Sequence, residues 1–270
     1  MALFPFPPFA NVLFRKSINC KCKKETKLLP ENRKLPQKYN LKYIIPNLFT
    51  AFSLICGMIA LQFVFEERFV MASWLIAASM IFDGLDGKIA RLLKASSKFG
   101  SQFDTLSDFF VFGVVPAFLV YRGALNHLKI IGMLISVLYV FAGGYRLVRF
   151  TLKNTDINSK HPFTGLPIPA AASLIASYFI INYYFWNEIH SYNILLAIVI
   201  FSSILMVSKV EYLPIEKKSK MTKESKFFLV LAIISLALAV KYSYLIFSGW
   251  VLMYIFYGIV RYLILLAKKG

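Results

Sequence analysis

The chain has 270 residues, and its 31 Lys and Arg outnumber its 13 Asp and Glu, so the formal net charge is +18. Hydrophobic residues make up 58% of the chain and charged residues 16%, against about 25% charged residues in ordinary soluble domains. This composition excludes intrinsic disorder and most soluble folds, because a single soluble core cannot bury so much apolar surface. The positive charge favours anionic lipid headgroups or phosphorylated substrates as partners, and we expect no nucleic acid.

The first 43 residues form a basic arm. They carry ten Lys or Arg and the Pro/Phe-rich run FPFPPF, without the continuous apolar stretch of a secretory signal. We interpret residues 1–43 as a cytoplasmic arm that could lie on the membrane surface. A solvated tail without a specific role is the alternative that this composition leaves open.

Eight apolar blocks follow the arm, and the first is an eighteen-residue run without a charge. Several blocks are shorter than the roughly 20 residues of a membrane span, so their helices must continue into polar flanks. The fold class that we predict is all-α: a polytopic membrane protein with about eight transmembrane helices. The blocks are 48–65, 69–82, 109–120, 130–150, 168–186, 194–207, 227–240 and 244–266.

The predicted organisation is a six-helix core at 44–215, a basic linker at 216–226 and a C-terminal hairpin at 227–270. Basic residues test this topology, because cytoplasmic loops collect Lys and Arg. With both termini cytoplasmic, 27 of the 31 basic residues lie inside. We therefore expect an integral, multi-pass membrane protein. The four basic residues expected outside are Arg68, Arg122, Lys129 and Lys241.

Four aspartates stand out between residues 83 and 110. Asp83 and Asp86 are three residues apart, and Asp104 and Asp108 are four apart, so each pair projects from one face of its helix. Gly100 lies between the pairs and is a plausible turn. A hairpin at this point would bring the two pairs together.

Four facing carboxylates repel one another unless cations separate them, which favours a divalent metal. Oxygen ligands without His or Cys favour Mg²⁺, Ca²⁺ or Mn²⁺, and such ions often complete their shell with substrate phosphate. The small residues Gly87 and Ala90 would let a ligand approach the backbone, and Arg91 could bind a phosphate. The alternative is a surface ion-pair network between the aspartates and nearby Lys and Arg.

The spacing D-x2-D-G-x2-A-R-x8-G-x3-D-x3-D resembles the signature of the CDP-alcohol phosphatidyltransferase family. Members of that family are membrane enzymes that transfer a phosphatidyl group from CDP-diacylglycerol to an alcohol and release CMP. The matching residues are Asp83, Asp86, Gly87, Ala90, Arg91, Gly100, Asp104 and Asp108.

The resemblance implies a role for each of these residues. Asp83, Asp86 and Asp104 would bind metal, while Asp108 would accept the proton of the alcohol and also contact metal. The implied cofactor is Mg²⁺ or Mn²⁺, as two ions, with Ca²⁺ as a further ion that the ligands could hold. Residues that would contact CDP-diacylglycerol are Gly87, Ala90, Arg91 and Gly100.

The start of the first span, Pro-Asn-x-x-Thr, resembles the nucleotide-facing first helix of the same family and adds Asn47 and Thr50 to the donor-binding residues. A proline-initiated helix with a polar first turn is the other interpretation. Arg146 and Arg149 are three residues apart on one helix face. They could bind the phosphate or carboxylate of the acceptor, or serve as ordinary cytoplasmic anchors.

Residues 161–177 and 205–218 resemble the phosphatidylserine synthase branch of the family, which implies L-serine as the acceptor, a homodimer and a site on the cytoplasmic face. Glycerol 3-phosphate or inositol phosphate are alternative acceptors. A divalent-cation transporter is the alternative from another class, but it does not explain Gly87, Ala90 and Arg91. The isolated histidines His127, His161 and His190 are expected at the surface rather than in the site.

Overall fold

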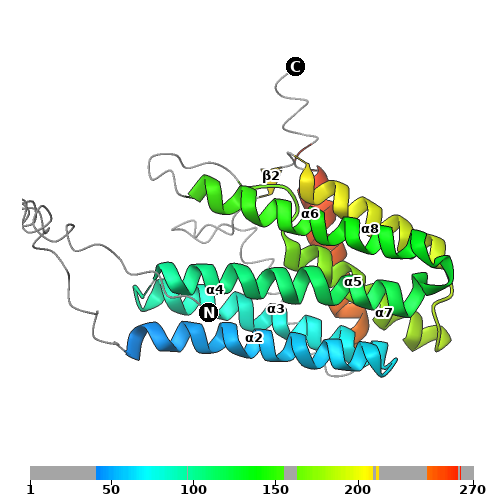
Figure 1. Ribbon diagram of the computed structural model, residues 1–270, viewed down its shortest axis with the longest axis horizontal. Helices are drawn as coiled ribbons and strands as arrows, with labels where there is room; N and C mark the ends of the chain where they lie inside the picture. The colour runs from blue at the N-terminus through cyan, green and yellow to red at the C-terminus, as the bar shows by residue number, and fades with distance from the viewer. Residues whose placement is uncertain are drawn as a thin grey trace, which may run out of the picture. The chain divides into compact units, whose positions relative to one another are not determined.

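In the computed structural model, residues 41–95, 97–154, 163–208, 211–212, 242–260 and 262 are described. They fold as a bundle of helices (Figure 1). The regular helices are α2 (Leu41–Phe65), α3 (Phe69–Leu92), α4 (Lys98–Asp108), α5 (Val115–Val120), α6 (Ile130–Asn154), α7 (Ile168–Trp186), α8 (Tyr192–Val207) and the helix Tyr242–Val260.

Six segments of the described chain are long and apolar enough to cross a membrane. The prediction of an all-helical polytopic membrane protein is therefore confirmed. Helix α8 is apolar but shorter, and the predicted span at 227–240 lies outside the described residues. So do residues 1–40 of the predicted arm at 1–43, whereas residues 41–43 belong to α2. The candidate spans are Ile44–Phe65, Phe69–Leu92, Lys98–Leu128, Ile130–Leu152, Ile168–Trp186 and Tyr242–Val260.

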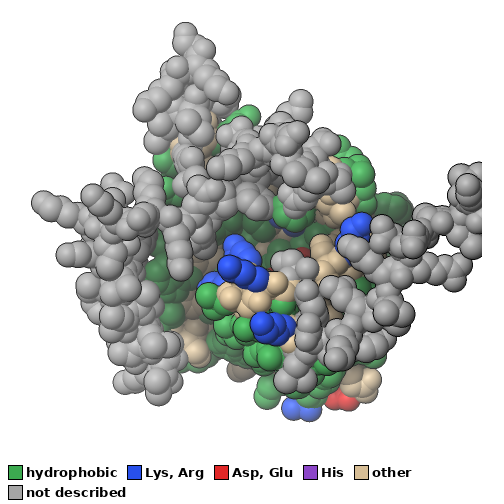
Figure 2. Space-filling model, turned by 90° about the vertical axis from the view of Figure 1, so that its left-hand side faces the viewer, with side chains coloured by type: hydrophobic (Ala, Val, Ile, Leu, Met, Phe, Trp, Pro, Cys, Tyr) green, Lys and Arg blue, Asp and Glu red, His purple; other side chains and the backbone are tan. Residues whose placement is uncertain are grey.

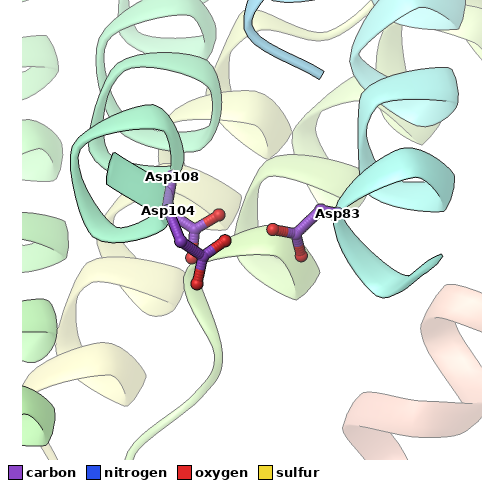
Figure 3. Close-up of side chains that lie close together, drawn as sticks. All are labelled: Asp83, Asp104 and Asp108. Carbon is purple, nitrogen blue, oxygen red and sulfur yellow. The ribbon is translucent and has the colours of Figure 1, made fainter. Parts of the chain in front are cut away.

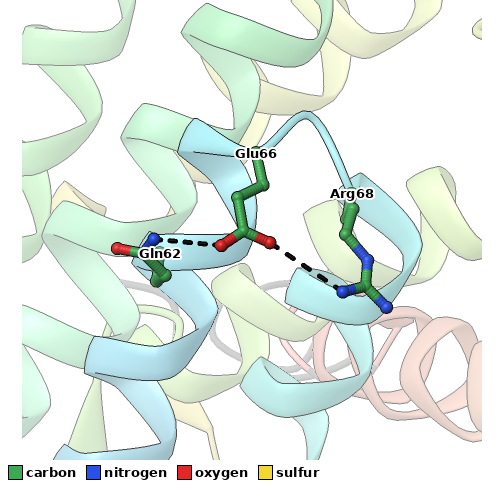
Figure 4. A network of polar contacts seen from close by, with 3 residues as sticks. All are labelled: Gln62, Glu66 and Arg68. Carbon is green, nitrogen blue, oxygen red and sulfur yellow. Dashed lines mark hydrogen bonds and ion pairs between the residues drawn. The ribbon is translucent and has the colours of Figure 1, made fainter.

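A polar turn connects α2 to α3 at the end of the bundle farthest from the aspartates. Gln62 Nε2 donates to Glu66 Oε1 over 3.0 Å, and Arg68 Nη1 lies 3.8 Å from Glu66 Oε2 (Figure 4). Glu67 adopts a left-handed backbone conformation with φ 61°, and its carboxylate accepts a hydrogen bond from Arg122 of the third span. This turn fixes the reversal of the chain that places α3 antiparallel beside α2.

The third span is one continuous stretch from Lys98 to Leu128 in which the helix type changes. Helix α4 is followed by a π-helical turn at Phe109–Val114, then α5, a second π-helical turn at Tyr121–Leu125 and a 3₁₀ turn at Asn126–Leu128. The expectation that short apolar blocks extend into polar flanks holds here and in α3. Both pairs of aspartates therefore lie on the polar extensions of membrane helices.

Gly100 is not in a turn, and that prediction was wrong. It occupies the first turn of α4, where its N–H donates to the Ser97 hydroxyl over 2.9 Å. Ser97 caps the helix, and the chain reverses before it, where Lys94 has a positive φ of 49°. Instead, the glycine lets α4 approach α2 closely, because a Cβ at Gly100 would lie 2.7 Å from Oδ1 of Asn47 on α2.

The entry to α7 is held by backbone hydrogen bonds. Pro167 precedes the helix and Gly165 has a φ of +88°, a conformation that favours glycine. A two-residue antiparallel ladder pairs β1 (Phe163–Thr164) with β2 (Glu211–Tyr212), and the Leu166 N–H donates to the Leu205 carbonyl. These bonds join the α7 entry to the end of α8.

Helices α2 and α3 pack along much of their length, as Figure 1 shows. Ser53 and Ser79 each donate a hydroxyl to the carbonyl of the other over 3.2 Å. Small residues let membrane helices approach closely, and Gly57 does so toward the third span, because a Cβ there would lie 2.6 Å from Cγ2 of Val111. At these points α2 therefore packs on α3 and on the third span through close backbone contacts rather than through large side chains.

We predict that Gly57→Ala destabilises the protein, because the added methyl group meets a β-branched side chain with restricted rotamers. Overpacking of this kind costs about 1–3 kcal/mol. Thermal unfolding in detergent should show a lowered midpoint for this variant. Gly249→Ala is the matched control, since a Cβ there meets no atom within 4 Å. Equal midpoints for the two variants would contradict the close packing of α2 on the third span.

Candidate active site

Three carboxylates converge at the polar ends of α3 and α4. Oxygen atoms of Asp83, Asp104 and Asp108 all lie within 4.8 Å of one another, and the three side chains are half-buried. Asp83 projects from α3 toward the two aspartates of α4, which share one helix face because they are four residues apart (Figure 3). The hairpin therefore brings members of both predicted pairs together.

This group is suited to a divalent cation. Its donors are carboxylate oxygens alone, which hard ions such as Mg²⁺, Mn²⁺ and Ca²⁺ prefer. Oδ1 of Asp104 is buried and has no hydrogen-bond partner among the described residues. A buried acceptor without a donor is costly, and a cation would satisfy it while relieving the repulsion between the carboxylates.

Asp86 takes a different position from the other three aspartates. It lies one helical turn beyond Asp83, is only 5% exposed, and its Oδ2 accepts a hydrogen bond of 2.7 Å from the Thr50 hydroxyl. The three-carboxylate group does not include it. Asp86 instead lines a cleft together with Asp104, so that Asp104 belongs to both the acidic group and the cleft.

The cleft lies between the start of α2, the end of α3 and the start of α4. All six residues predicted to contact CDP-diacylglycerol line it, although they come from three separate segments of the chain. Figure 2 shows this end of the molecule, where Lys and Arg side chains gather. The six residues are Asn47, Thr50, Gly87, Ala90, Arg91 and Gly100.

Arg91 is held along the wall of this cleft. Its Nε donates to the Gly87 carbonyl over 3.0 Å, one turn back in α3. Within the described residues its terminal nitrogens have no hydrogen-bond partner, and the side chain is exposed. The guanidinium is thus oriented but available, which suits it to bind a phosphate.

Arg146 and Arg149, which the sequence groups together, have different surroundings. Arg149 donates to the carbonyls of Val207, Met206 and Ser208, with distances of 2.9 to 3.4 Å, so it caps the end of α8. Among the described residues Arg146 forms no ion pair with an aspartate, but it lies within electrostatic range of Asp108 and Asp83. Its Nε is buried without a hydrogen-bond partner among the described residues.

Sequence reasoning missed two contributors to the site. Ser97 lines the cleft as well as capping α4, and a serine directly before a polar helical turn is a recognisable cap signal. Tyr254, which interacts electrostatically with Arg146, comes from the last described helix and has no sequence signal. His127 and His190 are exposed, as expected, and His161 lies outside the described residues.

The chain belongs to the CDP-alcohol phosphatidyltransferase family, whose model matches residues 43–207. It is 40% identical over 231 residues to a CDP-diacylglycerol–serine O-phosphatidyltransferase of Helicobacter pylori, covering 85% of this chain and 95% of that protein. The protein of the same name from Methanocaldococcus jannaschii is 35% identical over 190 residues, covering 70% and 83%. An archaetidylserine synthase of Methanothermobacter thermautotrophicus is 34% identical over 170 residues, covering 62% and 69%.

We predict that Gly100→Ala weakens binding of CDP-diacylglycerol while the protein stays folded. The added Cβ would displace the flexible Asn47 amide from the cleft rather than move backbone atoms. Loss of one hydrogen bond to the donor corresponds to a rise in its KM of roughly 3- to 10-fold. Steady-state kinetics with varied CDP-diacylglycerol would measure this, with Gly249→Ala as the control. An unchanged donor KM would remove Asn47 from the donor site.

Proposed function

We propose that this chain transfers the phosphatidyl group of CDP-diacylglycerol to L-serine, giving phosphatidylserine and CMP. The observation that carries the proposal is the cleft lined by the family signature, which adjoins a group of three carboxylates. Family membership supports the chemistry, and relatives named for the serine reaction support the acceptor.

The donor occupies the cleft in this proposal. Arg91 binds its diphosphate, while Gly87 and Ala90 let the nucleotide approach the backbone of α3. Asn47 and Thr50 form the opposite wall. The diphosphate then extends toward Asp104, which lies between the cleft and the acidic group.

Asp83, Asp104 and Asp108 would hold Mg²⁺ or Mn²⁺, and Asp86 would be a further ligand on the cleft side. When bound, the metal neutralises charge on the diphosphate and on the departing CMP. The Thr50 hydroxyl keeps the Asp86 carboxylate directed into the cleft. We propose two ions, the number that the resemblance to the family implies.

In the transfer step, the serine hydroxyl oxygen forms a bond to the phosphorus of the phosphatidyl group, and the bond from that phosphorus to the CMP oxygen breaks. Asp108 accepts the hydroxyl proton. Its position suits this role, because it lies at the end of α4, one turn beyond Asp104 and within electrostatic range of Arg146. Arg146 orients the serine carboxylate, while Arg149 acts as a positioning residue that holds the end of α8 nearby.

We place the site at the cytoplasmic face of an eight-span protein with both termini inside, and we propose a homodimer on the basis of family membership. The cleft lies at the end of the bundle where Lys and Arg side chains gather, as the positive-inside rule requires. Arg68 and Arg122 lie at the other end, at the turn between α2 and α3.

A direct test uses the purified full-length protein in detergent with CDP-diacylglycerol, labelled serine and Mn²⁺. We expect CMP release that depends on serine and labelled phosphatidylserine as the product. Asp104→Asn should lower the rate about 100-fold or more, since metal-based charge stabilisation contributes several kcal/mol. Glu66→Gln, an acid at the opposite end of α2, is the control and should retain activity. CMP release with glycerol 3-phosphate or inositol phosphate, and none with serine, would contradict the assignment of serine as the acceptor.

The two arginines give a separate prediction about the acceptor. Arg146→Lys keeps the charge but removes the planar guanidinium, so the serine KM should rise about tenfold or more with little change for CDP-diacylglycerol. Arg149→Lys should mainly lower thermal stability, because its partners are carbonyls of α8. A normal serine KM for Arg146→Lys would remove this residue from the acceptor site.

A further inference from the structure

We infer that Tyr139 is a positioning residue of this site: its buried hydroxyl holds the π-helical turn after Asp108 and thereby fixes where Asp108 lies relative to Arg146. Tyr139 lies in α6 and is fully buried. Its hydroxyl donates to the Phe112 carbonyl over 3.0 Å, a bond between residues 27 positions apart. None of the motifs in the sequence includes Tyr139.

The π-helical turn starts at the residue that follows Asp108. It spans Phe109–Val114, and the N–H of Val115 bonds to the Phe110 carbonyl five residues back. A π turn is rare and changes the helical phase, so the direction of Asp104 and Asp108 relative to the rest of the span depends on it. A bond from another helix to a carbonyl inside the turn stabilises this arrangement.

Helix α6 contacts the same turn along one face. Tyr139, Gly143 and Arg146 follow one another at helical spacings of four and three residues, which places them on one side of the helix. A Cβ at the neighbouring Gly144 would lie 3.2 Å from the ring of Phe109, so the backbone of α6 packs closely on that ring. The turn is therefore held between the Tyr139 bond and the packing of Phe109.

Two turns beyond Tyr139, the same face of α6 carries Arg146, which lies within electrostatic range of Asp108. The Tyr139 bond fixes how far α6 is displaced along the third span. It thus sets the position of Asp108, the proposed proton acceptor, relative to Arg146, the proposed ligand of the serine carboxylate. The cleft is built mainly from α2, α3 and the start of α4 and is linked to the turn through Asp104, so we expect the donor side to respond less than the serine side.

The inference rests on the proposed roles of Asp108 and Arg146, and Tyr139→Phe tests it in the full-length protein. Loss of one hydrogen bond should lower kcat/KM for serine by about 3- to 10-fold, with CDP-diacylglycerol KM within twofold. Tyr178→Phe is the matched control, because it removes a hydrogen bond of 2.7 Å from a tyrosine hydroxyl to the carbonyl of Ser191, the residue that precedes α8. It should lower the unfolding midpoint without changing either KM.

A second variant keeps the test decisive if Tyr139→Phe fails to fold. In Gly144→Ala the added methyl group presses on Phe109 and disturbs the same turn without changing the tyrosine. This variant should lower kcat/KM for serine more than it changes the KM for CDP-diacylglycerol, while Gly249→Ala should change neither. Loss of thermal stability with unchanged serine kinetics, or equal losses for both substrates, would overturn the positioning role. Suppose that Arg146→Lys has a normal serine KM while Tyr139→Phe has a lowered kcat. Arg146 would then not bind the serine carboxylate, and Tyr139 would act through Asp108 alone.

Discussion

Mutual repulsion among three carboxylates is the constraint on which the site depends. Oxygen atoms of Asp83, Asp104 and Asp108 lie within 4.8 Å of one another at the ends of membrane helices. Like charges in such a setting are unfavourable without a cation, and polar groups on membrane helices are retained where they serve function. A divalent ion bound by these acids would therefore stabilise the helix hairpin that holds them together.

The surrounding bundle makes this hairpin rigid through close backbone contacts. Ser53 and Ser79 tie α2 to α3, while Gly100 lets Asn47 approach the start of α4. Few of these contacts use large side chains, in keeping with helix packing in membranes, where small residues and hydrogen bonds replace the hydrophobic effect. As a result, the cleft is bounded by three helices whose spacing depends on glycine and serine.

Much of the fold and most of the candidate site can be predicted from the sequence. Apolar runs identify the helices, because the bilayer requires long apolar segments, and the spacing of Asp83, Asp104 and Asp108 indicates which helix faces meet. The signature also collects residues that the structure places in one cleft. Local spacing carries this information, since each part of the signature lies within one helix or its cap.

Other features depend on contacts between distant segments, which leave no local pattern. Gly100 suggested a turn, but the Ser97 cap and the approach of Asn47 explain it. Arg146 and Arg149 look equivalent along α6, yet only the position of the α8 carbonyls separates their roles. The bond from Tyr139 to the π-helical turn is of the same kind. The most direct test of the central claim is an experimental structure with Mn²⁺, located by its anomalous scattering. We expect Mn²⁺ in contact with Asp83, Asp104 and Asp108; Mn²⁺ bound elsewhere, with these three carboxylates free of metal, would contradict it.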